Sequence, residues 1–218
     1  MQRDALMDAQ HFETVISNLW ADLTEQNGTF QRMQKLPRIM SAMYSAGHSV
    51  AELIPIFKQY LVASSELKSP GLSDVVYPLC FAILLGLSGE DRKLLEETLL
   101  KDSGCEPFAV FLSDSLQLEH RMVDGNETIW KFYQQVRVIP TTEGKEEFLA
   151  NYLRRSWYNS NKGEAWWGYH TRFGGAKYFG YWAWEIAATA RVYGLDDTLL
   201  CESRYYPADL AHYLDGKQ

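Results

Sequence analysis

Glu185 is the residue of this sequence whose type and setting best suit acid–base chemistry. It lies in residues 182–188 (WAWEIAA), among apolar and small side chains. Burying a carboxylate in such a setting is costly unless it is paired or hydrogen-bonded. One interpretation is a general acid or base with a raised pKa. We favour a buried structural link, because no second catalytic group accompanies Glu185; the expected partners are Arg172, Arg191, Arg204, His170 and several tyrosine hydroxyls.

Asp196-Asp197-Thr198 is the second pattern with possible chemistry, since acidic pairs of this kind bind metals in some helical enzymes. The pair directly follows Gly194 and precedes a short helical turn. An aspartate in that position caps free backbone amides and complements the helix dipole. No further acidic motif lies at a matching spacing, so we interpret the pair as a helix cap.

The histidines and cysteines form no metal-binding motif. No HExxH pattern occurs, no two histidines lie one helical turn apart, and the cysteines show no CxxC or Cys/His pairing. Nucleophile-elbow, P-loop and dinucleotide motifs do not occur either. Gly174-Gly175 precedes a predicted helix, and we interpret it as a tight turn rather than an anion site. The sequence therefore predicts no catalytic residues, no metal and no cofactor. The cysteines are expected to be reduced thiols. The histidines and cysteines considered are His11, His48, His120, His170, His212, Cys80, Cys105 and Cys201.

Negative charge is concentrated in the middle of the chain. Residues 90–127 hold ten acidic and four basic side chains, a net charge of −6 out of −7 for the whole sequence. Direct binding to nucleic acid is disfavoured because phosphate contacts need a basic face. A basic protein partner suits this stretch, with a merely solvated face as the alternative. The residues predicted to face such a partner are Asp102, Glu106, Asp114, Glu119, Asp124 and Glu127.

Length and hydrophobicity predict a globular protein. The chain has 218 residues, of which 46% are hydrophobic, enough for a sizeable core without metals or disulfides. The longest apolar run, residues 75–87, is interrupted by Pro78 and is shorter than the roughly 20 residues that cross a bilayer. The first residues are polar and amphipathic, which is not typical of a secretory signal. We expect a cytoplasmic protein that does not bind membranes.

Apolar residues recur at helical spacing along most of the chain. The pattern predicts helices that include residues 12–23, 33–43, 53–61, 73–87, 94–99, 108–116, 129–136, 142–158 and 176–193, with short turns near residue 197 and after Pro207. Ser49 and Glu52 form a capping box, Ser88 to Asp91 form a second cap, and Pro107 suits a first helical turn. Residues 136–139 alternate briefly, but Pro140 favours a loop.

These elements predict an all-α fold, a compact bundle of about nine to eleven helices. Most connections are short, so neighbouring helices should be antiparallel. We expect an N-terminal helical part, residues 1–125, packed closely on an aromatic-rich C-terminal part, residues 126–218.

Three strings in the C-terminal part resemble one known family. Residues 178–188 (YFGYWAWEIAA), 193–197 (YGLDD) and 205–210 (YYPADL) resemble the C-terminal domain of the PoNi family, the polymorphic nuclease immunity proteins. Residues 3–6 (RDAL), with His11-Phe12 and Ile16, resemble the opening of that family's N-terminal helical domain. On this resemblance, the motif residues are Tyr178, Gly180, Tyr181, Trp182, Glu185, Asp196, Asp197, Tyr205, Tyr206, Pro207 and Asp209.

The resemblance implies a bacterial cytoplasmic immunity protein without a catalytic role. Its partner would be a cognate toxin, a nuclease delivered by a type VI or related secretion system. An acidic inhibitor can occupy the basic groove of a nuclease and exclude its substrate. Two alternatives stay open: a small helical enzyme that uses Glu185 to reverse toxin damage, and a helical adaptor.

Overall fold

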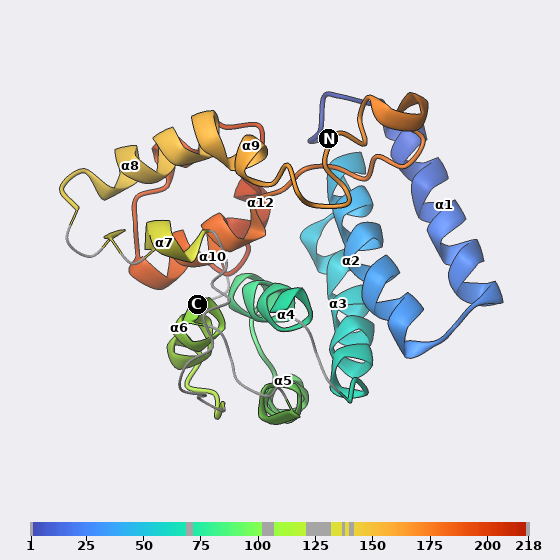
Figure 1. The fold of residues 1–218 in the computed structure, drawn as a ribbon, viewed down its shortest axis with the longest axis horizontal. Coiled ribbons are helices and arrows are strands. Elements are labelled where there is room, and N and C mark those ends of the chain that lie inside the picture. Colours follow the sequence, from blue (N-terminus) through green and yellow to red (C-terminus); the bar gives the residue numbers. More distant parts are fainter. Residues whose placement is uncertain are drawn as a thin grey trace.

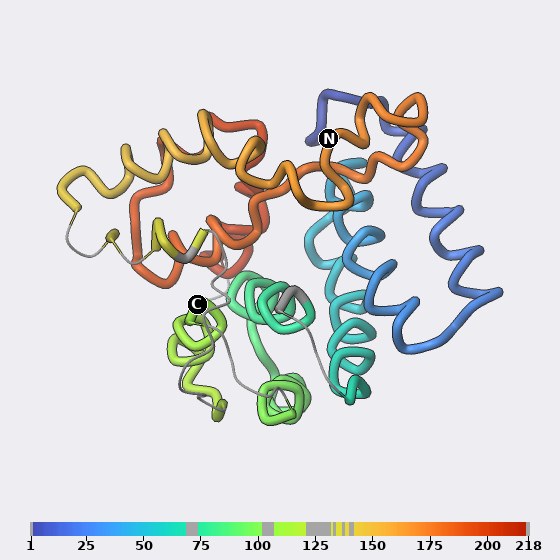
Figure 2. Tube along the Cα trace, in the orientation of Figure 1, coloured from blue at the N-terminus to red at the C-terminus, as the bar shows by residue number. Residues whose placement is uncertain are grey.

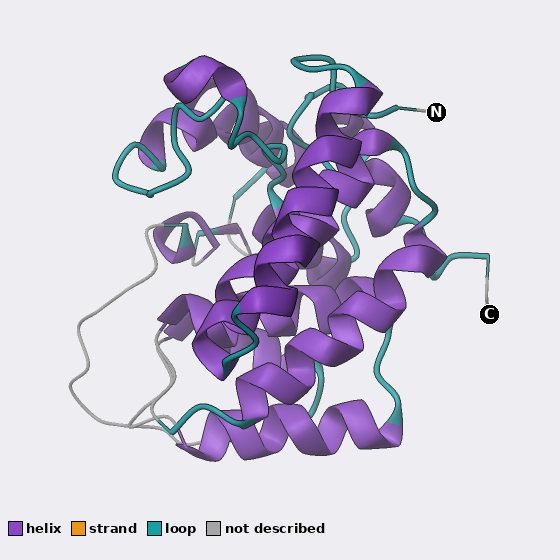
Figure 3. Cartoon of the chain, turned by 90° about the vertical axis from the view of Figure 1, so that its right-hand side faces the viewer, coloured by secondary structure: helices purple, strands orange, loops and turns teal. Residues whose placement is uncertain are grey.

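A computed structural model of the chain describes residues 2–68, 72–101, 107–120, 132–136, 138–139 and 142–216. All regular structure within these residues is helical, which confirms the all-α fold class (Figure 3). The helices are, in chain order, α1 (Ala9–Glu25), α2 (Thr29–Ala46), α3 (Val50–Ser65), α4 (Leu72–Leu85), α5 (Gly89–Lys101), α6 (Pro107–Ser115), α7 (Tyr133–Val136), α8 (Lys145–Tyr152), η2 (Leu153–Trp157, a π-helix), α9 (Tyr158–Ser160), η3 (Arg172–Gly175, a 3-10 helix), α10 (Trp184–Tyr193), α11 (Thr198–Cys201) and α12 (Ala208–Ala211).

The first three helices lie side by side as an antiparallel group (Figure 1). The apolar stripe predicted for the first helix is the buried face of α1, from Phe12 to Leu23. Asp8 caps this helix by accepting a hydrogen bond from the amide of His11 at 2.8 Å. Gly47, with φ of 100°, ends α2 in the left-handed conformation that glycine tolerates best. Periodicity and end signals therefore placed these helices correctly.

Two predicted helix caps are present. The carboxylate of Glu52 accepts a hydrogen bond from the amide of Ser49 at 2.8 Å, at the start of α3. At the start of α5, Asp91 accepts from the amide of Ser88 at 3.1 Å, and its own amide donates to the Ser88 hydroxyl at 3.2 Å. Each cap satisfies amides that the first helical turn leaves free.

Helix α4 lies at the centre of the molecule and packs against α3, α5, α6, α10 and α12 (Figure 2). Its sequence is apolar on all faces, the pattern of a helix that is buried all round. Its main partner is α10, whose residues 184–190 are all buried. Buried side chains from both parts of the chain form one core, so the two predicted parts are packed closely together. The predicted boundary at residue 125 lies outside the described residues.

The helix predicted for residues 142–158 is present as one helical run from α8 through α9. It begins at Lys145, after Gly144, and contains the π-helical turn η2. Residues 136, 138 and 139, in the stretch that alternates, do not form a strand.

The helix predicted for residues 176–193 is wrong over its first half. Residues 178–183 form no regular structure, and α10 begins only at Trp184. The aromatic pattern suits a helix or an irregular segment, and here contacts with distant residues hold the chain out of a helix against its local preference. Figure 1 shows residues 161–183, in orange, crossing above the start of α1 and the end of α2.

No helix among the described residues combines the length and the apolar character that spanning a bilayer requires.

Candidate functional site

The two ends of the chain that carry the family resemblance contact each other. The Arg3 guanidinium lies 2.5 Å from the Asp209 carboxylate and donates to the carbonyl of His48 at 2.7 Å. The buried Asp4 accepts a hydrogen bond from the hydroxyl of Tyr178 at 2.5 Å. Burial and the Asp4 charge raise the pKa of Tyr178, so this hydroxyl stays a donor. Asp4 therefore ties the start of the chain to the aromatic segment, which we define as residues 178–185, and Arg3 ties it to Asp209.

Gly180 allows the aromatic segment to pass very close to the end of α2. Its φ is 105°, and a Cβ atom there would lie 2.1 Å from the Ser45 hydroxyl oxygen. That oxygen accepts a hydrogen bond from the indole of Trp182 at 2.9 Å, and the hydroxyl donates to the carbonyl of Phe179 at 3.2 Å. A side chain at position 180 would separate these groups, which explains the glycine.

Tyr181 is the centre of a group of aromatic rings. Its ring meets those of Tyr178 and Tyr158 with centroid distances of 4.6 and 5.2 Å, both strongly inclined. Inclined rings place a positive edge against a negative face, which is the favoured arrangement. The Tyr181 hydroxyl also lies 2.9 Å from Nδ1 of His170. Tyr178, Tyr181 and Trp182 of the motif are thus buried core residues.

Glu185 is buried and bonded to a partner that the sequence analysis did not name. Its Oε1 accepts a hydrogen bond from the Trp157 indole at 2.6 Å. The expected arginine partners are used elsewhere: Arg191 binds Asp215 at 2.9 Å. Burial raises the pKa of Glu185 from 4.5 to about 7, although the indole bond opposes this shift. The link therefore ties α10 to η2, rather than to the C-terminal loop.

A cavity of about 430 Å³ lies between α2, α4 and the aromatic segment. Its size is that of a small-molecule pocket. Glu185, Glu164 and Asp74 bring carboxylates to its wall and Arg38 brings one cation, while most of the remaining wall is aromatic. A carboxyl group with a pKa near neutrality can transfer protons, and aromatic walls suit apolar or cationic groups. The cavity is the observation that keeps the enzyme alternative open.

Asp196 and Asp197, the pair predicted to form a helix cap, have different roles. Asp196 accepts from the amide and hydroxyl of Thr198 at 3.0 and 2.6 Å, as a capping residue does. Asp197 occupies the N-cap position of α11 but makes no side-chain cap bond. Its carboxylate instead accepts from the Tyr206 hydroxyl at 2.6 Å and from Nε2 of His212 at 2.9 Å. Asp197 thus joins the α11 turn to the chain around α12.

The remaining motif residues hold the last turns of the chain against this core. The carbonyl of Tyr205 accepts a hydrogen bond from the amide of Ala183 at 2.9 Å, beside the aromatic segment. The Tyr205 ring stacks on Tyr158 at 5.9 Å. Pro207 lies at the N-cap position of α12, directly before its first residue Ala208.

The comparisons with known proteins agree with this geometry. The family model described as PoNe immunity proteins (PoNi), C-terminal, matches residues 108–210, which contain most of the contacts above. This part of the chain is similar to the C-terminal domain of the PoNi family. The crystal structure of protein PA2201 from Pseudomonas aeruginosa has the same fold, with a TM-score of 0.59 and 20% identity over 94% of this chain and 78% of that one. No curated protein matches the chain significantly.

Residues 108–210 also hold four of the six acidic residues predicted to face a partner, and two of these four are among the described residues. Asp114 and Glu119 are exposed, at the end of α6 and just beyond it. The Glu119 amide donates to Glu96 of α5 at 3.3 Å, and Arg92 of α5 donates to the carbonyl of Leu116 at 3.1 Å. These bonds place the end of α6 and the residues after it beside Glu96 and Arg92 of α5. The other four predicted residues, Asp102, Glu106, Asp124 and Glu127, lie outside the described residues.

The distant hydrogen-bond partners of the motif residues could not be predicted from the sequence. Ser45, Trp157 and His212 each bond a motif side chain that lies between 15 and 137 positions away. None of the three belongs to a local pattern that marks such a role. Asp4 was noticed only as part of the N-terminal resemblance, and its bond to Tyr178 gives that short match a physical meaning.

Proposed function

We propose that this protein is an immunity protein that binds a cognate PoNe-type nuclease toxin and neutralises it without catalysis. The observation that carries the proposal is the PoNi family match over residues 108–210, together with the burial of the motif that defines it. The setting is the cytoplasm of a bacterium that meets the toxin through a type VI or related secretion system.

Stoichiometric binding accounts for the buried Glu185 better than catalysis does. Its carboxylate bonds an indole, which does not titrate and cannot relay a proton onward. It lies at the first turn of α10, in the shared core, and so fixes the packing of the C-terminal part. We therefore assign Glu185 a structural role.

The acidic surface of α5 and α6 is the proposed contact with the toxin. It includes exposed Glu97, Asp114 and Glu119, together with the partly exposed Glu96. A nuclease domain carries a basic groove for its substrate. Complementary charge speeds the encounter of two proteins and orients them as they meet. An inhibitor seated in that groove excludes nucleic acid without contacting the catalytic residues.

Protection of a cell requires tight binding, and a molecule of this size can supply it. A nanomolar complex corresponds to about −12 kcal/mol. An interface of roughly 800 Å² per partner, with a few buried anchors, reaches that affinity. No cofactor or metal is needed for this mode of inhibition.

Co-purification with the product of the neighbouring toxin gene tests the proposal directly. We expect a stable complex of this protein and the toxin, and a nuclease activity that disappears at one equivalent of inhibitor. Pre-incubation of the nucleic acid substrate with this protein alone should leave the substrate unchanged. Sub-stoichiometric, time-dependent protection would contradict the proposal and favour an enzyme, while the absence of any complex would favour an adaptor.

A further inference from the structure

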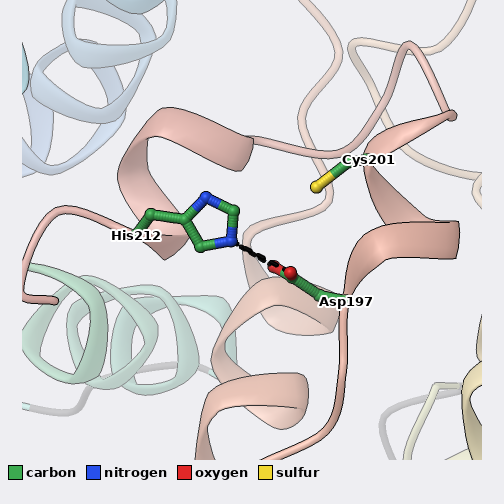
Figure 4. A group of neighbouring side chains, drawn as sticks. All are labelled: Asp197, Cys201 and His212. Carbon is green, nitrogen blue, oxygen red and sulfur yellow. Dashed lines mark hydrogen bonds and ion pairs between the residues drawn. The ribbon is translucent and has the colours of Figure 1, made fainter.

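Three side chains with metal-binding atoms meet at the C-terminal corner of the molecule (Figure 4). The ligand atoms of Asp197, Cys201 and His212 all lie within 4.8 Å of one another. Asp197 and Cys201 are four residues apart at the two ends of α11, so they project from one face of that turn. His212 directly follows α12. We propose that these three residues bind a zinc-like divalent transition metal ion.

The donor set selects the class of ion. Thiolate sulfur, imidazole nitrogen and carboxylate oxygen are the three ligand types that zinc uses in proteins. Magnesium and calcium prefer oxygen ligands throughout, so the thiol of Cys201 argues against them. The neutral imidazole with one thiolate and one carboxylate also balances the charge of a divalent ion.

The distances require only small movements to accommodate the ion. Nε2 of His212 lies 2.9 Å from both carboxylate oxygens of Asp197. With zinc–ligand bonds of about 2.0–2.3 Å, tetrahedral ligand atoms are separated by about 3.5 Å. The imidazole and carboxylate must therefore part slightly while the thiol approaches. The His212 side chain is 49% exposed and Cys201 is exposed, so little packing opposes these rotations.

Tyr206 holds the carboxylate of Asp197 from behind. Its buried hydroxyl donates to Oδ2 of Asp197 at 2.6 Å. Hydrogen bonds of this kind orient metal ligands and are part of most protein metal sites. The Asp197 side chain is only 18% exposed, and its carboxylate faces His212. The least mobile ligand is thus already fixed in place.

Charge and space around the three residues also suit a cation. An open cavity of about 440 Å³ adjoins Asp197 and His212, and Asp196 and Asp215 also line it. The one arginine in its wall, Arg191, binds Asp215 at 2.9 Å, which leaves the other two carboxylates in excess. The excess negative charge attracts a cation, and the cavity leaves room for water as a fourth ligand.

Titration of the untagged, metal-free protein with cobalt(II), followed by zinc competition, tests the proposal. Cobalt substitutes for zinc and reports thiolate ligation by a sulfur-to-metal charge-transfer band. We expect one equivalent to bind, with that band, and zinc to displace it. Cys201→Ser should abolish the band and weaken cobalt binding at least about tenfold, since it removes a direct ligand. The hydroxyl occupies the same exposed position, so folding should be unaffected.

Two further variants separate ligation from unspecific surface binding. Tyr206→Phe removes only the hydroxyl behind Asp197 and should weaken binding about 10- to 100-fold while keeping the band. His48→Gln is the matched control, because His48 also lies beside two carboxylates, of Glu13 and Glu52, but has no thiol near. It should change neither band nor affinity. A band that survives in Cys201→Ser, or wild-type protein without saturable binding at micromolar cobalt, would overturn the proposal.

Discussion

The aromatic segment and the acidic α5–α6 surface are built in opposite ways. The aromatic segment is buried, and its backbone and side chains are fixed by bonds to Asp4, Ser45 and Trp157. The acidic surface is exposed, and its two helices are joined by Arg92 and Glu96 through bonds that solvent reaches. The aromatic segment, which carries the resemblance to the PoNi family, is therefore internal. On the proposed function, recognition of a particular toxin would belong to surfaces that can change without disturbing that interior.

Substitution of Gly180 should give the largest loss of stability. Gly180→Ala forces a side chain into a backbone with φ of 105° and places Cβ against the Ser45 hydroxyl. Strain and overpacking together should lower the free energy of unfolding by about 4 kcal/mol. Gly163→Ala is the control, because nothing lies within 4 Å of a Cβ there. Urea denaturation measures both, and equal losses would show that the close approach to α2 is not a constraint.

Glu185 should make the folded state less stable as pH rises toward neutrality, which is opposite to the usual effect of a carboxylate. Its folded pKa of about 7 lies above the ordinary 4.5, so the folded state holds the proton more tightly. Its contribution is therefore fully present below pH 4.5 and is lost as pH rises through 7. The shift corresponds to about 3 kcal/mol. Glu185→Gln should remove this loss, and the variant should gain stability relative to wild type between pH 4.5 and 8.

Denaturation of both proteins across that pH range measures the effect. Glu202→Gln provides the control, because Glu202 is an exposed carboxylate paired with Arg154 at 3.0 Å. A constant difference between Glu185→Gln and wild type would contradict the raised pKa. The same variant tests the enzyme alternative, since purified Glu185→Gln should still inhibit the toxin at one equivalent.

The sequence predicted regular helices well and the aromatic segment poorly. The apolar stripe of α1 and the caps at Ser49 and Ser88 are local patterns, because they depend only on residues close together in the sequence. The start of α10 depends on distant residues: Phe179 and Trp182 are held outside a helix by bonds to Ser45, which lies 137 positions from Trp182. Periodicity contains no information about such partners.

The candidate sites show the same division. Burial of Glu185 follows from its apolar neighbours, but its bond to Trp157 depends on how η2 meets α10. Asp197, Cys201 and His212 match no spaced motif, because His212 reaches the other two only through the turn before α12. A single sequence predicts which residues are costly to bury, and the fold decides what they contact.

Removal of the Tyr178 hydroxyl should cost less than either interior change above. Tyr178→Phe leaves the buried Asp4 with its bond to the amide of Leu6 at 2.7 Å but without its tyrosine partner. Loss of a hydrogen bond to a buried charged group costs about 2 kcal/mol. Tyr169→Phe, on a partly exposed ring of the same region, should change stability by less than about 0.5 kcal/mol. Thermal denaturation compares the two, and similar values would mean that Asp4 does not anchor the N-terminus.

Reversal of the acidic surface should have the smallest effect on free energy, and the effect should fall on binding alone. Asp114→Lys with Glu119→Lys changes the net charge by four units at exposed positions. Glu25→Lys with Glu143→Lys makes the same change at exposed positions on α1 and before α8. Both double variants should fold as wild type does. Only the first should weaken toxin binding, by about 1 kcal/mol, mainly through slower association that becomes less marked at high salt. Association rates measured at two salt concentrations test whether the acidic surface contacts the toxin. Equal slowing by both double variants would indicate a general effect of net charge. No slowing by the first double variant would place the toxin on another face of the molecule.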